Sequence, residues 1–186
     1  MCRCVSGNGG GQGRRGGRVN GKIIGVGLVI SGLIAGIAMY WLQVYAFYEP
    51  VSFQPGNEIR LVPISSDIPE VIVADNVTGI DANSSPLRFR ACFTTPLSQA
   101  MLTETYVVYE GAEPLVAPGW FDCFDATKIG KALETGEAIA FLSEKNINSK
   151  PDAAGVVQPS GIDQVVAVFP DGHAYAWHQL NDILKD

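Results

Sequence analysis

The sequence predicts an α+β protein in which one N-terminal transmembrane helix precedes a small antiparallel-sheet domain with one or two helices. Ile23 to Tyr48 hold no formally charged side chain, and this run exceeds the roughly 20 apolar residues that a membrane-spanning helix needs. Ala126 to Thr135 have helical periodicity behind Asp125, a good N-cap. Gln164 to Gln179 alternate on both sides of the turn residues Pro170-Asp171-Gly172, which predicts a β-hairpin.

The basic residues before the helix predict its orientation. No acidic residue precedes the helix, so the positive-inside rule places the N-terminus in the cytoplasm and the remainder outside it. The basic residues are Arg3, Arg14, Arg15, Arg18 and Lys22. A cleaved signal peptide is the alternative, but its apolar region is only about 7 to 15 residues long, and the run from Ile23 to Leu42 is longer. The far end of the run carries five aromatic residues, as is typical of an interface belt: Tyr40, Trp41, Tyr45, Phe47 and Tyr48.

The remainder of the chain is strongly acidic. Of 13 basic and 19 acidic residues in all, eight basic and 19 acidic ones follow the helix, which gives this part a formal charge of −11. This charge argues against nucleic acid as a partner and favours a basic protein surface.

One face of the helix carries only small residues. Gly27, Ser31 and Ala35 recur every four positions, and Gly32 and Gly36 form a GxxxG pattern beside them. Such rows let a second helix approach closely, so we expect the helix to pair with itself or with a larger membrane protein. The alternative is that these residues reflect only the high Gly and Ala content of membrane helices.

The four cysteines fall on two sides of the predicted membrane. Cys92 and Cys123 lie on the oxidising side and are expected to form a disulfide; free buried thiols and a metal pair are the alternatives. Cys2 and Cys4 lie on the reducing side, in a Gly- and Arg-rich segment.

The chain divides into four predicted parts. Residues 1–18 are expected to be a disordered leader, which the native protein lacks if translation begins at Val19. Residues 19–48 are expected to be the transmembrane anchor and residues 49–58 a stiff stalk. Residues 59–186 are expected to form the extracytoplasmic domain. Within the domain, residues 75–86 are expected to form a surface loop. Leu87 to Thr94 alternate as a half-buried strand with Cys92 off the main core face. Thr105 to Tyr109 fit either a helix or a strand.

No constellation predicts an enzyme. His173 and His178 differ by an odd number of positions on one strand, so they point to opposite faces; we interpret His178 as a half-buried polar residue at the sheet end. Three carboxylate pairs are expected to form a solvated acidic face: Glu110 with Glu113, Asp122 with Asp125, and Glu134 with Glu137. The sequence predicts no cofactor and no metal; a site formed by His178, Cys92 and Cys123 would sacrifice the disulfide.

Several sequence blocks resemble a known family. GKIIG and QVYAFYE flank the anchor, and SSPLRFRACFTT, ETYVVYEGAEPLVAPGWFDCFDA, GEAIAFL, GIDQVVAVFPDG and WHQLN follow. Together, from Val19 to Asn181, they resemble an uncharacterised family of small single-pass alphaproteobacterial inner-membrane proteins, some labelled histidine kinase. A kinase needs a phosphorylatable helical His and an ATP-binding domain, neither of which this sequence predicts. The resemblance implies no functional residues.

These observations predict a non-enzymatic accessory, assembly or sensing module of a membrane complex. The protein would lie in the bacterial inner membrane with a periplasmic domain. The first alternative is a periplasmic domain that binds a small ligand, and the second is a thiol or metal redox protein.

Overall fold

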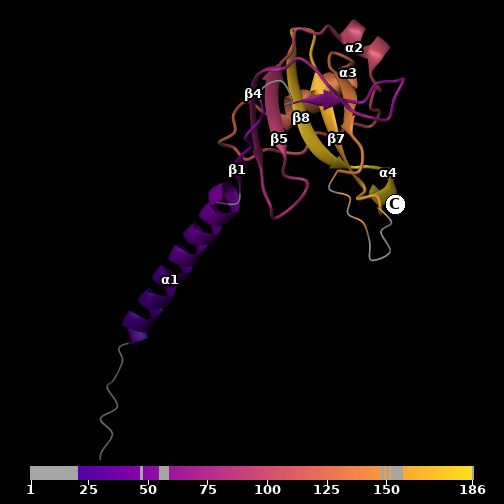
Figure 1. Ribbon diagram of the computed structural model, residues 1–186. Helices are drawn as coiled ribbons and strands as arrows, with labels where there is room; N and C mark the ends of the chain where they lie inside the picture. Colours follow the sequence, from indigo (N-terminus) through magenta and orange to yellow (C-terminus); the bar gives the residue numbers. More distant parts are fainter. Residues whose placement is uncertain are drawn as a thin grey trace, which may run out of the picture. The chain divides into compact units, whose positions relative to one another are not determined.

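The computed structural model describes residues 21–46, 48–54, 59–147, 149, 151 and 157–185. The chain divides into two compact units, one ending at Trp41 and the other beginning at Leu42 (Figure 1). The leader expected over residues 1–18 lies outside the described residues.

The first unit is an apolar helix. Helix α1 (Gly21–Trp41) has no buried residue, and the π-helical turn η1 (Leu42–Ala46) follows it in the chain. Gly21–Tyr45 are long and apolar enough to cross a membrane, since 25 residues at about 1.5 Å each exceed a hydrocarbon core of about 30 Å.

The second unit is built on an antiparallel sheet. Its six strands have the order β1-β4-β5-β8-β7-β6, and a separate pair is formed by β2 and β3. The strands are β1 (Glu49–Pro50), β2 (Arg60–Leu61), β3 (Glu70–Val71), β4 (Asp75–Asp81), β5 (Arg90–Thr94), β6 (Ile139–Glu144), β7 (Ile162–Val168) and β8 (His173–Leu180). The helices are α2 (Gln99–Thr105), α3 (Ala126–Thr135) and the single turn α4 (Asp182–Lys185). The predicted α+β class is therefore confirmed.

Helix α3 has the caps that its sequence predicts. The Asp125 carboxylate accepts hydrogen bonds from the N–H groups of Thr127 and Lys128, at 3.0 and 3.1 Å. Gly136 ends the helix in the left-handed conformation with φ of 74°, which glycine adopts without steric cost. Helix α2 ends at Thr105. The rest of the ambiguous segment Thr105 to Tyr109 is not helical, because Tyr106 forms an isolated β-bridge with Pro63 and Val108 forms one with Phe141.

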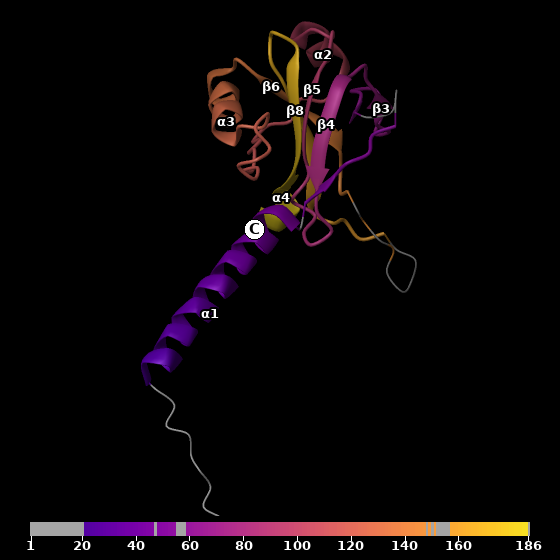
Figure 2. The ribbon, with the colours of Figure 1, turned by 90° about the vertical axis from the view of Figure 1, so that its left-hand side faces the viewer.

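The sheet is covered on both faces. Figure 2 shows α3 on one side of the sheet and β3 on the other. Phe89, Ala91 and Phe93 belong to the core on one face, while Cys92 and Trp177 belong to the core beneath α3. The predicted alternation of the β5 segment is correct, but this strand is buried on both faces, because it lies in the middle of the sheet between β4 and β8.

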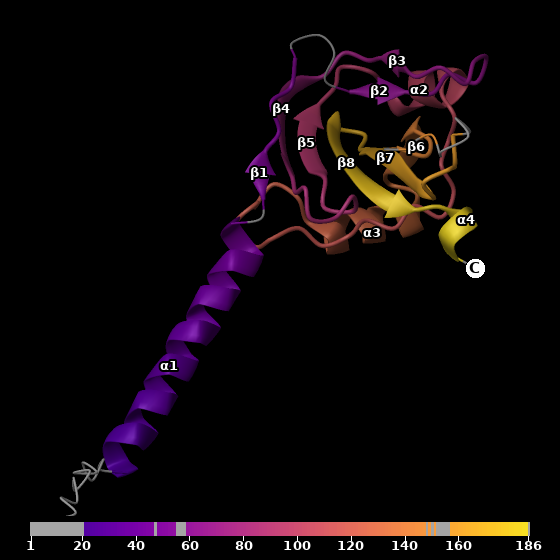
Figure 3. The same cartoon turned by 60° about the horizontal axis from the view of Figure 1, so that its bottom comes forward.

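Two other segments differ from expectation. The described part of residues 49–58, expected as a stalk, contains β1, which pairs with β4 at the sheet edge (Figure 3). Most of residues 75–86, expected as a loop, form strand β4. Gly79 lets Phe53 pack closely, since a Cβ there would lie 2.8 Å from the Phe53 ring. The segment that contains Phe53 and strand β4 thus stabilise each other through this contact. Neither segment has a local sequence pattern that predicts it.

Candidate functional site

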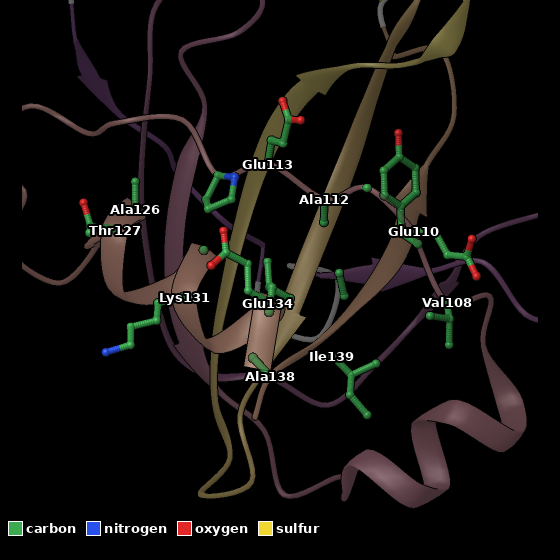
Figure 4. A pocket seen from close by; sticks show the side chains of 16 residues that line it. Val108, Glu110, Ala112, Glu113, Ala126, Thr127, Lys131, Glu134, Ala138 and Ile139 are labelled. Atoms are coloured by element: carbon green, nitrogen blue, oxygen red, sulfur yellow. The ribbon is translucent and has the colours of Figure 1, made fainter. Parts of the chain in front are cut away.

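A groove of about 940 Å³ lies between helix α3, residues 108–114 and the beginning of β6 (Figure 4). Small apolar side chains form much of its lining, including Ala112, Ala138 and Ala140. Gly130 faces Pro114 across the groove, and a Cβ there would make an ordinary van der Waals contact, 3.6 Å from Cγ of Pro114. The groove is wide because the residues that line it are small.

Hydrogen bonds determine where the groove opens. Tyr109 N–H donates to the Ala140 carbonyl at 2.8 Å, so the chain runs beside β6 up to this point. Residues 110–114 then leave β6 and bind the Gln179 side chain of β8. Its Oε1 accepts from Glu113 N–H at 2.8 Å, and its Nε2 donates to the Gly111 carbonyl at 3.3 Å. The groove occupies the space between residues 110–114 and β6, where the two separate.

The rim of the groove is predominantly acidic. Glu110 and Glu113 come from the segment beside β6, and Lys131 and Glu134 come from α3 (Figure 4). All four side chains are exposed. Within the described residues, Glu110 and Glu134 have no ion-pair partner. Three carboxylates and one ammonium group therefore give the rim an excess of negative charge around an apolar floor.

A buried polar network supports one wall. The Tyr109 hydroxyl donates to Oδ2 of Asp163 at 3.2 Å, and Asp163, only 5% exposed, accepts at Oδ1 from Asn146 N–H and Asn181 Nδ2. Burial, followed by the charge of Asp163, raises the pKa of Tyr109 to about 12. Tyr109 is thus neutral at ordinary pH and has a structural role. These partners are 17 to 54 residues apart in the sequence, so no local motif could identify them.

His178 is fully enclosed, in contrast to the half-buried position expected for it. The side chain is 7% exposed and stacks on Phe89 at 4.6 Å between ring centroids. Its Nδ1–H donates to the Pro86 carbonyl at 2.7 Å, and Nε2 lies 3.3 Å from the Gln164 side-chain amide. The Gln164 atom at this distance is Oε1. Because a neutral ring with its proton on Nδ1 can only accept at Nε2, a hydrogen bond to Gln164 forms only when the amide is turned so that its NH₂ group faces the ring. Burial lowers the pKa of His178 to about 4, so the ring is neutral near pH 7.

Arg90 is another buried polar group that the sequence pattern did not identify. Its guanidinium is 3% exposed and donates to the carbonyls of Leu115 and Val116, and also to those of Leu87 and Phe89. Burial lowers the pKa of Arg90 to about 10. The alternation of β5 identified the face on which Arg90 lies, but not the loop that covers this face. Arg90 fixes the backbone of this loop.

The structure brings the predicted cysteine pair together. Cys92 and Cys123 form a disulfide with their Cα atoms 6.3 Å apart. Cys92 is buried on β5, and Cys123 is exposed on the loop before α3. The bond therefore connects the middle of the sheet to this loop.

The helix-packing prediction stays a prediction. At Gly27, Gly32 and Gly36, an added Cβ would meet no atom within 4 Å. Ser31 and Ala35 are also exposed on α1. The Ser31 hydroxyl donates to the Leu28 carbonyl at 2.9 Å, so its hydrogen bond is satisfied within the helix.

The remaining candidates do not assemble into a chemical site. All six paired carboxylates are exposed, and Asp125 caps α3; the six are Glu110, Glu113, Asp122, Asp125, Glu134 and Glu137. Within the described parts of the chain, no group of three or more His, Cys, Asp or Glu side chains has an arrangement that could hold a metal ion.

Fold and site together define a class: a protein whose described residues include one candidate membrane span and a disulfide-linked antiparallel-sheet domain that carries an acidic-rimmed groove. Residues 59–186 match the model of a family of unknown function, DUF6446. The match covers more than half of the chain, so the protein belongs to this family. No curated protein matches the chain. No solved structure matches it either.

Proposed function

We propose that the protein is a single-pass protein of the bacterial inner membrane whose periplasmic domain is a non-enzymatic accessory or assembly module. In this proposal the groove beside α3 binds a basic, partly apolar segment of a partner membrane protein. The groove itself is the observation that carries the proposal.

Charge complementarity supports a basic occupant. The rim carries Glu110, Glu113 and Glu134 against Lys131, and the chain beyond the helix has a formal charge of −11. Such a field attracts a basic segment from a distance and disfavours an acidic one. The small apolar side chains of the floor leave room for the aliphatic parts of lysine or arginine side chains, which can pack on apolar surface while their charged ends reach the rim.

The surroundings of the titratable groups support a role other than catalysis. The groups with the largest pKa changes are His178, Arg90 and Tyr109. His178 and Arg90 are buried against backbone carbonyls, and Tyr109 donates to Asp163. Their polar atoms thus have partners inside the domain, whereas a catalytic group needs access to its substrate.

Charge reversal at the rim tests the proposed interface. The double variant Glu110→Lys, Glu134→Lys of the full-length protein, at native expression, is compared with the wild type after mild detergent extraction. A matched control, Asp67→Lys with Glu104→Lys, makes the same charge change at exposed positions that do not line the groove. We expect the rim variant to recover at least about tenfold less of the co-purifying membrane protein, because desolvated charge contacts contribute a few kcal/mol.

Three outcomes would contradict parts of the proposal. Equal recovery with the rim variant and its control would exclude the groove as the partner site. A small molecule that raises the melting temperature of the wild type but not of the rim variant would instead assign the groove to a soluble ligand. Protease added to intact spheroplasts should digest the domain; full protection there would place the domain in the cytoplasm.

A further inference from the structure

An aromatic cluster joins the loop before α3 to the end of the candidate span. Trp120 Nε1–H donates to the Val44 carbonyl at 2.8 Å. The Trp120 ring stacks on Tyr45, with centroids 6.2 Å apart, and meets Tyr48 edge-on at 5.9 Å. The Phe121 ring meets Trp120 edge-on, with centroids 6.3 Å apart. These residues all belong to the unit that begins at Leu42.

Apolar side chains of the same loop point into solvent. Val116 is 80% exposed, and Leu115 is also exposed. Their backbone is held from below, because the buried Arg90 guanidinium donates to both carbonyls. The disulfide at Cys123 fixes the far end of the loop. The loop therefore presents apolar side chains on a fixed backbone, and burying them elsewhere would require breaking these contacts.

The position of this loop identifies what covers it. Val44 and Tyr45 are the last residues of the candidate span Gly21–Tyr45, and Trp120 contacts both of them. The end of a membrane span lies at the boundary between hydrocarbon and headgroups, where tryptophan and tyrosine are enriched. Trp120 must then lie at the same boundary, together with the exposed side chains on its loop.

We propose that residues 115–121 form a lipid-contact surface that lies in the headgroup region of the membrane crossed by α1. This inference rests on the membrane anchorage in the proposed function. The charged groups next to this cluster are the exposed carboxylates of Glu49 and Asp122 and the guanidinium of Arg88, which lies 5.4 Å from the centroid of the Tyr48 ring. Two carboxylates outweigh one guanidinium, so anionic lipids give no electrostatic advantage. The affinity comes from apolar and aromatic burial, and the occupant is a zwitterionic lipid interface.

Quenching of tryptophan fluorescence by brominated lipids tests this proposal on the full-length chain in phosphatidylcholine vesicles. The Trp41→Phe variant leaves Trp120 and Trp177, of which Trp177 is fully buried. Lipids brominated near the headgroup should quench Trp120 at least about twofold more than lipids brominated near the chain ends. Replacing one third of the lipid by phosphatidylglycerol should leave the quenching unchanged.

A second pair of variants provides a matched control. In a background of Trp41→Phe and Trp120→Phe, a tryptophan is placed by Val116→Trp or by Ile68→Trp. Ile68 is 74% exposed, and it lies between β2 and β3. Tryptophan at position 116 should be quenched by the shallow bromolipid, and tryptophan at position 68 should show little quenching. Equal quenching at the two positions, together with unquenched Trp120, would overturn the lipid-contact surface.

The same samples separate this inference from the proposed anchorage. Extraction with alkaline carbonate, followed by flotation, shows whether the chain stays with the vesicles. A chain that floats but shows no shallow quenching would refute only the lipid-contact surface. A chain released by carbonate would refute the anchorage, and the inference with it.

Discussion

The enclosed His178 should make the domain sensitive to mild acid. Its pKa is about 4 in the folded protein, against an ordinary value of 6.5, because burial penalises the charged ring. The unfolded chain therefore takes up a proton at this position before the folded domain does. The free energy of unfolding should be fully retained above pH 6.5 and should fall as the pH drops from 6.5 towards 4.

The size of the effect follows from the two pKa values. A difference of about 2.5 corresponds to about 3 kcal/mol once the pH is below both values. At pH 5, protonation of the unfolded state alone already costs about 2 kcal/mol. The charged neighbour Arg90 acts in the same direction, while the hydrogen bond to Pro86 opposes it in part.

Urea unfolding of the full-length chain in detergent micelles, at pH values between 7 and 5, measures this loss through intrinsic tryptophan fluorescence, to which the buried Trp177 contributes. The wild type should lose about 2 kcal/mol over this range beyond the loss shown by His178→Gln, which removes the titrating ring. His173→Gln is the matched control, because His173 lies on the same strand with an exposed side chain. The reasoning fails if His178→Gln retains the pH dependence of the wild type.

Two further changes probe the covalent and steric constraints of the domain. The free energy of unfolding of the double variant Cys92→Ala, Cys123→Ala, measured in urea, should be roughly 3 to 4 kcal/mol lower than that of the wild type. The two residues are 31 positions apart, and the bond between them restricts the unfolded chain. A wild-type stability that does not change when reductant is added would contradict this prediction. Gly172→Ala should cost about 3 kcal/mol, since φ is +86° and the new Cβ would lie 2.7 Å from the Thr95 carbonyl oxygen. Gly119→Ala, where a Cβ would meet no atom within 4 Å, is the control and should change the melting temperature by less than about 2 °C.

Local patterns predicted the elements that are determined locally. The bounds of α3 follow from its two caps. The Asp125 side chain caps the beginning of the helix, and Gly136 ends it by adopting the left-handed backbone conformation. The hairpin of β7 and β8 follows from alternation on either side of a turn. The cysteine pairing followed from the predicted membrane topology, which separates Cys92 and Cys123 from the other two.

The missed features depend on distant partners. Strand β4 contains Asn76 with φ of 54° and Gly79, residues typical of turns, and it is stabilised by β1 and β5 on either side. Arg90 lies on a strand face that would be exposed without the loop above it. The groove exists because residues 110–114 bind Gln179 instead of following β6. None of these contacts has a signature within a short window of sequence.

The place of β8 in the sheet determines when the domain can fold. In chain order this is the last of the described strands, yet it lies between β5 and β7. A polypeptide still being synthesised has no complete sheet until residues 173–180 have been made, and until then both neighbouring strands offer unpaired backbone edges. Premature termination before residue 173 would thus divide the sheet in the middle and leave an aggregation-prone fragment, however much of the sequence had already been made.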